Sequence, residues 1–139
     1  MLKIIPFLLF DGNCAEAMKF YKSCIGGELT LTKLGDTPMK NQFSPEKYNK
    51  IINANLKSGA IEFSATDWLD PTHKPKQGTN FSIFIIGKTF NELKVVFDKL
   101  SEGADLENYQ DLHNMPFGTY GQLTDKYGVR WIFKGDKRK

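Results

Sequence analysis

The stretch NCAEAMKFYKSC, residues 13–24, combines a helix start with a helical apolar stripe. Asn13, followed three positions later by Glu16, has the pattern of a capping box, in which two side chains accept hydrogen bonds from backbone N–H groups at a helix start. One face of this helix carries apolar residues at helical spacing, namely Ala17, Phe20, Tyr21 and Cys24. The pattern predicts an amphipathic helix that ends at the glycine pair 26–27.

The same arrangement returns in the second half of the chain. Thr89 and Glu92 form a second capping box, which is followed by an equivalent stripe of Leu93, Val96, Phe97 and Leu100. An apolar strand precedes each helix, and a hairpin closes each half. The predicted strands are 4–10, 51–56 and 60–66 in the first half and 81–86, 119–124 and 129–134 in the second, with one extended segment after each helix.

The repeated order is strand, helix, strand, strand, strand. One helix covers one face of a four-stranded sheet, so two copies are expected to curl their sheets toward each other. The predicted fold class is α+β, with two βαβββ modules in tandem whose antiparallel sheets surround a central cleft, helices outside. We expect a single domain over residues 1–139, with module one at about 1–76, module two at about 77–135 and a basic tail at 136–139.

Composition narrows the function classes. The 139 residues are 40% hydrophobic and 25% charged, as in a globular protein, and the net charge is only +3. No basic run is interleaved with aromatic residues, which argues against a nucleic-acid partner. The apolar N-terminus is too short for a membrane span and lacks a cleavage site, so we expect a cytoplasmic protein. Cys14 and Cys24 fall on one helix, about 15 Å of rise apart, and are expected to be reduced.

The first hairpin sorts its side chains by face. With Ser58 and Gly59 as a two-residue turn, Asn55 is expected opposite Glu62. One face is then wholly apolar and should pack on the helix. The cleft face carries Asn53, Asn55, Glu62, Ser64 and Thr66.

The second hairpin follows the same rule if residues 126–128 form a three-residue loop with Gly128 in the left-handed region. Leu123, Val129, Trp131 and Phe133 then face the helix. The residues expected on the cleft face are Tyr120, Gln122, Thr124, Arg130 and Ile132, joined by Asn80, Ser82 and Phe84 from the strand at 81–86. These polar faces could also simply meet solvent, and Arg130 could form a structural ion pair with Glu62 instead of binding an anion.

Further candidates lie near the strand ends. Asp67 and Trp68 follow the fourth strand, where Trp68 could stack on a ligand or serve an interface, and Phe117 is a candidate pocket wall. The segment 35–49 is expected to be a loop with one helical turn at 45–48. His73 and His113 fall in predicted loops and are expected to be solvated, unless a loop folds over the cleft and supplies a general base.

Two long motifs carry a family resemblance. PFLLFDGNCAEAMKFYKSCIGGE, residues 6–28, and FGTYGQLTDKYGVRWIF, residues 117–133, resemble the opening and the closing motif of the PhnB-like branch of the vicinal oxygen chelate superfamily. That superfamily includes glyoxalases, bleomycin-resistance proteins and extradiol dioxygenases. The resemblance covers nearly the whole chain and implies a homodimer. The branch also carries the label of a 3-demethylubiquinone methyltransferase, but no methyl-donor motif is visible.

The resemblance also implies metal-ligand positions. In metal-using members the ligands are His, Gln or Glu, and the corresponding positions here are Pro6, Asn80, Ile132 and either Glu62 or Phe63. Asn53 stands where relatives often carry His. Only Glu62 remains as an anionic ligand, which is too few for a tight divalent site. No cofactor is predicted, and a divalent metal is disfavoured.

Two functions follow from this pattern. The first is a small-molecule-binding protein of the glyoxalase/bleomycin-resistance type, which holds a small compound, with an anion among the candidates, in a metal-free cleft. The alternative is a metal-independent or weakly metal-assisted enzyme, of lyase, isomerase or transferase type. In that alternative Glu62 is the base and Arg130 or the amides hold an oxyanion. A weaker third option is a scaffold whose cleft has filled with side chains.

Overall fold

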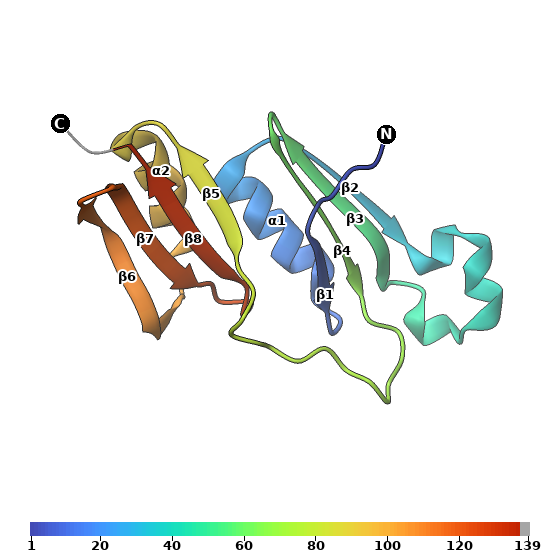
Figure 1. Cartoon of the computed structure of the whole chain (residues 1–139). Helices are drawn as coiled ribbons and strands as arrows, with labels where there is room; N and C mark the ends of the chain where they lie inside the picture. Colours follow the sequence, from blue (N-terminus) through green and yellow to red (C-terminus); the bar gives the residue numbers. More distant parts are fainter. Residues whose placement is uncertain (137–139) are drawn as a thin grey trace. The chain divides into compact units, whose positions relative to one another are not determined.

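The computed structural model describes residues 1–136, so the predicted basic tail at 136–139 lies outside the described residues except for Asp136. The chain divides into two compact units, Met1–Lys76 and Gln77–Lys139. Each unit contains a four-stranded sheet and one α-helix, which Figure 1 shows by the labels β1–β4 with α1 and β5–β8 with α2. The predicted α+β class and the repeated βαβββ module are confirmed.

The first unit begins with β1 (Phe7–Phe10), α1 (Cys14–Ile25) and β2 (Glu28–Lys33), and it closes with β3 (Ile51–Ser58) and β4 (Ile61–Asp67). The sheet order is β1-β4-β3-β2. Three short 3₁₀ turns join β2 to β3, at Leu34–Asp36, Pro38–Gln42 and Pro45–Lys47. The last of them is the turn predicted in this segment.

The second unit contains β5 (Ile83–Gly87), α2 (Phe90–Leu100), β6 (Asp105–Met115), β7 (Gly118–Thr124) and β8 (Arg130–Gly135). Its sheet order, β5-β8-β7-β6, repeats that of the first unit. β6 is irregular, because its pairing with β7 shifts register on both sides of Gln110.

The sheets are mixed, whereas the sequence predicted antiparallel sheets. β1 pairs parallel to β4 and β5 pairs parallel to β8, while the remaining pairs are antiparallel. The cause is the helix after the first strand: a strand–helix–strand unit returns the chain to the same end, so the next strand runs in the same direction. Two hairpin reversals later, the last strand has that direction again.

The helix-facing sides of the sheets form the two cores. In the first unit α1 buries one face, and Tyr21 meets Phe63 of β4 edge-on with ring centroids 5.8 Å apart. In the second unit Phe97 of α2 meets Phe133 of β8 edge-on at 5.1 Å. Trp131 is 1% exposed. Cys14 and Cys24 are both buried, and no disulfide bond joins them.

The register predicted for the first hairpin is wrong by two residues. Lys57 lies opposite Glu62 and Asn55 opposite Ser64, so the turn residues are Gly59 and Ala60. Gly59 has a φ of 61°. Type II′ turns need a positive φ at their first central position, which favours glycine there and displaces Ser58 into the strand. A shift of two residues preserves the side-chain alternation, so the predicted faces of β3 and β4 are retained.

The second hairpin has the predicted three-residue loop. Asp125 N donates to Val129 O at 2.8 Å, and Gly128 has a φ of 87°. Leu123, Trp131 and Phe133 are buried on the helix side as expected. Phe81, the first residue of the strand predicted at 81–86, is largely exposed and lies before β5.

The two predicted capping boxes differ in outcome. Thr89 Oγ1 accepts from Glu92 N at 3.1 Å, so the second helix is capped as predicted. Asn13 makes no side-chain cap hydrogen bond, so the first box is wrong. Asp67 replaces it, because its Oδ1 accepts from Cys14 N at 2.9 Å. None of the helices in residues 1–136 combines the length and the apolar content that crossing a membrane requires.

Candidate functional site

The face of the first sheet that α1 leaves uncovered carries a small polar network. Asn55 donates from Nδ2 to Glu62 Oε2 at 3.2 Å and to Ser64 Oγ at 3.0 Å. Glu62 Oε1 also accepts from the ammonium of Lys3. The three predicted residues therefore lie together, while Asn53 lies on the same face and is exposed.

Glu62 is held in its charged form. The hydrogen bond from Lys3, followed by that from Asn55, lowers the pKa of the Glu62 carboxyl. A carboxylate with a lowered pKa is a weaker base than an unperturbed one. The surroundings of Glu62 in the first unit therefore give no support to its role as a general base.

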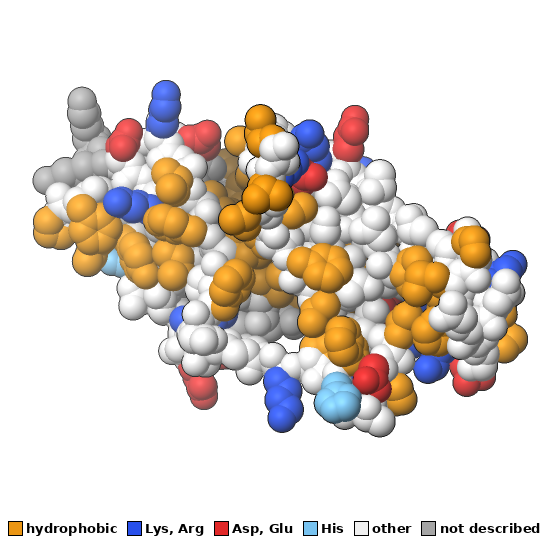
Figure 2. All heavy atoms as spheres, turned by 45° about the vertical axis from the view of Figure 1, so that its right-hand side comes forward, with side chains coloured by type: hydrophobic (Ala, Val, Ile, Leu, Met, Phe, Trp, Pro, Cys, Tyr) orange, Lys and Arg blue, Asp and Glu red, His pale blue; other side chains and the backbone are white. Residues whose placement is uncertain are grey.

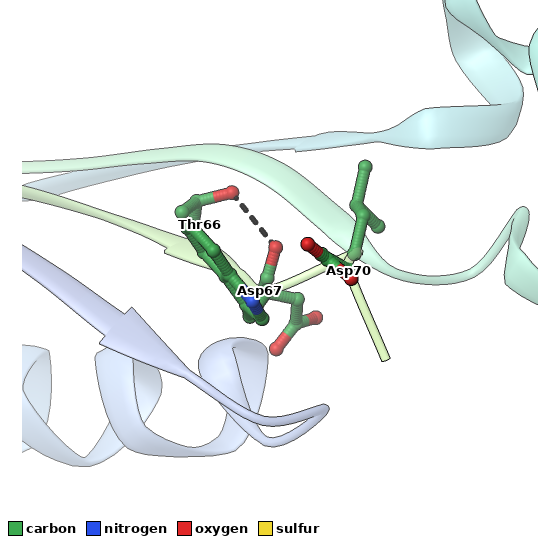
Figure 3. A pocket seen from close by; sticks show the side chains of 5 residues that line it. Thr66, Asp67 and Asp70 are labelled. Atoms are coloured by element: carbon green, nitrogen blue, oxygen red, sulfur yellow. Dashed lines mark hydrogen bonds between the residues drawn. The ribbon is translucent and has the colours of Figure 1, made fainter. Parts of the chain in front are cut away.

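A hollow of about 290 Å³ opens where β4 ends (Figure 3). Its lining consists of five consecutive residues, Thr66, Asp67, Trp68, Leu69 and Asp70. Two of these, Asp67 and Trp68, are among the residues predicted from the sequence. The Thr66 hydroxyl shares its one proton between Asp67 O at 3.1 Å, as the dashed line in Figure 3 shows, and Ile51 O at 3.2 Å.

Asp67 is 3% exposed, and both of its carboxylate oxygens are occupied. Oδ1 accepts from Cys14 N, and Oδ2 accepts from Ile51 N at 2.8 Å. The carboxylate thus ties the start of α1 to the start of β3. Burial, with a smaller contribution from the Asp67 charge, raises the pKa of the Cys14 thiol to about 12. The Asp67 side chain is therefore a fixed part of the wall of the hollow. The Cys14 side chain stays a protonated thiol at neutral pH.

Trp68 is one of the residues that line the hollow. Its indole Nε1 is buried and finds no acceptor among the described residues. The Trp68 backbone is fixed, since its N–H donates to Phe10 O at 2.6 Å. A buried indole N–H normally has a partner, and leaving it without one is unfavourable by about 1–3 kcal/mol.

Asp70 lies at the exposed rim of this hollow. It accepts from Thr72 N at 2.9 Å and Thr72 Oγ1 at 2.7 Å, and its Oδ2 lies 3.1 Å from His73 Nδ1. These bonds, with that of the Thr72 hydroxyl largest, lower the pKa of the Asp70 carboxyl. The sequence predicted His73 as a solvated loop residue, or as a general base if its loop folds over the cleft, and nothing in its spacing indicated the pairing with Asp70.

The second unit collects the other predicted residues on the uncovered face of its sheet. Tyr120 Oη donates to Gln122 Oε1 at 3.0 Å, and the Phe117 ring lies 6.3 Å from the Tyr120 ring. Arg130 donates from Nη1 to Thr79 O at 2.7 Å. Hydrophobic side chains are prominent on the molecular surface in Figure 2, and Phe84, Ile86 and Phe117 are among the exposed ones.

Asn80 does not lie where the sequence placed it. β5 begins only at Ile83, whose partner is Trp131, and β8 begins one residue earlier at Arg130. Asn80 lies three residues before this first pair, in the preceding bend, and has no partner in the ladder. The predicted strand was too long at this end.

The metal positions implied by the resemblance do not fit a metal. Pro6 and Ile132 have no donor atom in their side chains, Asn80 lies outside β5, and Glu62 is taken by Lys3 and Asn55. Within residues 1–136 no three side chains of His, Cys, Asp or Glu gather closely enough to hold a metal ion. We therefore derive no chemical step through a metal.

Comparisons with known proteins agree with the sequence motifs. The model of the family described as 3-demethylubiquinone-9 3-methyltransferase matches residues 2–133. Protein YjdN of Escherichia coli K12 is 26% identical over an alignment of 147 positions, which covers 99% of this chain and 98% of that protein.

Solved structures extend the likeness to three dimensions. Protein PA1353 from Pseudomonas aeruginosa has a TM-score of 0.84 and 29% identity, covering 99% of both chains. A PhnB protein from Bacillus cereus has a TM-score of 0.71 and 26% identity, over 96% of this chain and 99% of that one. A glyoxylase/bleomycin resistance protein/dioxygenase domain from Frankia sp. is 12% identical with a TM-score of 0.66, over 99% of this chain and 93% of that chain, and shows the fold alone.

The family model covers nearly the whole chain and the two βαβββ modules match those of a PhnB protein, so the chain belongs to the family described as 3-demethylubiquinone-9 3-methyltransferase.

Proposed function

We propose that this chain is a small-molecule-binding protein of the glyoxalase/bleomycin-resistance type, and that the hollow at the end of β4 takes its ligand without a metal. The observation that carries the proposal is the buried indole N–H of Trp68, which has no acceptor among the described residues and lies beside a hollow of about 290 Å³. A ligand with a hydrogen-bond acceptor would supply the missing partner.

The lining also limits the charge of this ligand. Asp67 and Asp70 both contribute to the wall, and the pKa of Asp70 is lowered, so Asp70 is negative at neutral pH. A fully anionic compound would be repelled here. The ligand proposed for this hollow is therefore neutral, with a carbonyl or similar acceptor that faces Trp68 and a body that lies against Leu69.

A second candidate is an enzyme, with one observation in its favour. Asp70 Oδ2 lies 3.1 Å from His73 Nδ1 beside the hollow, and this geometry keeps Nε2 of a neutral histidine available as a base. The Glu62 version of the enzyme has no comparable support, because the hydrogen bonds from Lys3 and Asn55 lower the pKa of that carboxyl and so weaken it as a base. The His73 side chain is largely exposed, which favours binding over catalysis as the first proposal.

The test follows the indole proton itself. ¹⁵N-labelled protein is titrated with N-methyl-2-pyrrolidone, a neutral planar carbonyl compound, and the two tryptophan indole signals are recorded. Trp131 is the internal control, since its Nε1 already donates to Asp125 Oδ2 at 2.8 Å. We expect the Trp68 signal to shift saturably and the Trp131 signal to stay in place.

Trp68→Phe is the matched variant, because it removes the N–H and keeps an aromatic ring. We expect it to fold and to bind the probe about tenfold more weakly, as for the loss of one buried hydrogen bond. A Trp68 signal that does not move at saturating probe, or equal affinity in Trp68→Phe, would overturn the proposal.

The homodimer also enters as a proposal. β1 and β5 are edge strands of their sheets, and they carry exposed apolar side chains, Phe7 and Leu9 on β1 and Phe84 and Ile86 on β5. Such edges are usually covered in native proteins. Light scattering after size exclusion should give twice the 15.8 kDa chain mass, and a monomer at micromolar concentration would contradict it.

A further inference from the structure

A cluster on the uncovered face of the second sheet has no role in the hollow at β4. It contains His113 from β6, Phe117 from the turn that follows, Tyr120 from β7 and Lys134 from β8. His113 and Tyr120 are partners in the β6–β7 ladder, and Tyr120 and Lys134 are partners in the β7–β8 ladder. Three neighbouring strands therefore place these side chains in one row across the face.

The hydrogen bond of His113 defines its tautomer. Nδ1 lies 2.7 Å from the carbonyl oxygen of Asp111, and a carbonyl can only accept a hydrogen bond, so Nδ1 carries a proton. In the neutral ring Nε2 is then the acceptor. The contact with Asp111 also fixes the plane of the ring, which meets the Tyr120 ring edge-on at a centroid distance of 6.1 Å.

Aromatic surface and a positive charge complete the cluster. The Phe117 ring is 54% exposed and meets the Tyr120 ring edge-on. Lys134 Nζ lies 5.5 Å from the Phe117 ring centroid, over its face, and Lys134 has no ion pair with a carboxylate among residues 1–136. An exposed aromatic face beside a cation that has no counter-ion is a surface suited to a flat anion.

We propose that His113, Phe117, Tyr120 and Lys134 form a binding site for a planar aromatic carboxylate that carries a hydroxyl group at the far end of its ring. The carboxylate pairs with Lys134, and the hydroxyl donates to His113 Nε2. Because the Phe117 and Tyr120 rings are nearly perpendicular, the ligand ring stacks on one of them and meets the other edge-on. The hydroxyl of Tyr120 stays with Gln122 and fixes the Tyr120 ring.

The spacing suits such a ligand. His113 and Lys134 both flank Tyr120, so they are two strand spacings, or about 10 Å, apart at the backbone. The His113 ring contacts the Tyr120 ring and Lys134 Nζ lies over the Phe117 ring, so a benzene ring substituted at opposite ends is proposed to span the gap between them. This site differs in charge from the hollow at β4, which has two aspartates in its wall, and it does not depend on that proposal.

The experiment uses the full chain and four probes: 4-hydroxybenzoate, benzoate, cyclohexanecarboxylate and phenol. Dissociation constants come from chemical-shift titration at pH 7.5 and fixed salt. We expect 4-hydroxybenzoate to bind tightest, benzoate about tenfold more weakly for the missing hydrogen bond to His113, and cyclohexanecarboxylate more weakly still because its ring is not flat. The shifted signals should be those of β6, β7 and β8.

Three variants separate the contacts. Lys134→Met should weaken both benzoates by about tenfold or more and leave phenol unchanged. His113→Phe should abolish the preference for 4-hydroxybenzoate over benzoate while it keeps a ring beside Tyr120. Lys126→Met is the matched control, since Lys126 also lies over an aromatic ring, that of Tyr127 at 5.6 Å, and should change nothing.

Two results would overturn the proposal. One is binding of cyclohexanecarboxylate as tight as that of the benzoates, and the other is an equal loss in Lys134→Met and Lys126→Met. A His113→Phe variant that does not fold leaves the Lys134→Met arm decisive, because Lys134 is exposed and its replacement leaves the core unchanged. Loss of the Trp68 response with N-methyl-2-pyrrolidone would not bear on this site.

Discussion

The two modules share a scaffold but differ at the last pair of their parallel strands. In the first module that pair is Phe10 and Asp67, and in the second it is Gly87 and Gly135. A Cβ on Gly135 would lie 2.6 Å from Leu93 Cδ1 of α2 and 3.1 Å from Gly87 O, so a side chain there would require Leu93 to shift. The first module places a buried carboxylate at the same point.

The carboxylate of Asp67 in the first module, where the second module has Gly135, also changes which residue caps the N-terminus of the helix. The first N–H of α1 receives its acceptor from Asp67, which lies 53 residues further along the chain. The first turn of α2 is capped locally by Thr89, and Glu92 Oε2 accepts in turn from Lys88 N at 3.1 Å. The same requirement, an acceptor for unpaired helix N–H groups, is therefore met by a distant strand in one module and by the adjacent sequence in the other.

The largest effect is expected at Asp125, the buried carboxylate of the second module. It accepts from Tyr127 N, Val129 N and Trp131 Nε1, and it holds the β7–β8 loop. Asp125→Ala should lower the free energy of unfolding by about 4 kcal/mol, because three donors lose their acceptor. Urea unfolding measures this, with Trp131→Phe as a control that removes one of the three bonds. A decrease in the free energy of unfolding of less than about 1 kcal/mol would show that the β7–β8 loop keeps its conformation without the Asp125 carboxylate.

Asp67→Ala is the corresponding change in the first module. Two backbone donors, Cys14 N and Ile51 N, would lose their acceptor, so we expect a loss of about 3 kcal/mol. Hydrogen exchange should locate the damage at the start of α1 and of β3. Uniform loss of protection throughout the first unit, with no bias toward these two ends, would contradict the role given to Asp67.

The cap residues themselves give a smaller and sharper contrast. Thr89→Ala should destabilise the protein by about 1 kcal/mol, because its hydroxyl accepts from Glu92 N. Asn13→Ala should change stability by less than about 0.5 kcal/mol, since Asn13 makes no cap hydrogen bond. Thermal unfolding of both variants compares them directly, and equal losses would remove the distinction between the two helices.

The smallest effect concerns pH and belongs to the first module alone. Hydrogen bonds from Lys3 and Asn55 lower the folded-state pKa of Glu62, so its contribution to stability is present above the unfolded-state pKa. That contribution is lost as the pH falls through the lowered, folded-state pKa. Glu62→Gln should therefore reduce the acid sensitivity of the first unit slightly, and Asn53→Gln, a change on the same face, should not. Parallel stability curves for Glu62→Gln and the parent chain between pH 5 and pH 2, roughly the range over which such a carboxylate titrates, would argue against the pairing.

Local signals predicted the fold well, and distant contacts were missed. The helices, the repeat and the Gly128 loop depend on residues within one turn or hairpin of each other, so spacing alone indicates them. The predicted register of the first hairpin was wrong by two residues, because side-chain alternation has a period of two and cannot distinguish two registers that differ by two residues.

The candidate site was harder to predict from the sequence, because its contacts also join residues that are far apart in the chain. The sequence indicated Asp67 and Trp68 as candidate residues. It did not indicate that backbone N–H groups at the start of α1 and of β3 donate hydrogen bonds to both oxygens of the Asp67 carboxylate. Lys3 precedes the first strand and belongs to no helical or strand pattern in the sequence, so its pairing with Glu62 could not be predicted from residue spacing. His113 was assigned to a loop, whereas it lies in the irregular part of β6, where register shifts obscure the strand pattern.

The parallel pairing of each first strand with its last has a consequence for how the chain folds. Phe7 meets Ser64 and Ile83 meets Trp131, so neither edge can join its sheet before nearly the whole module exists. The hairpin between β3 and β4 closes a loop of only two residues and can form early. During synthesis the first strand of the first module therefore stays unpaired, with its apolar side chains exposed, until β4 has been made. Pairing β1 with β4 closes a loop that contains most of the module, and this step should limit the folding rate of the module.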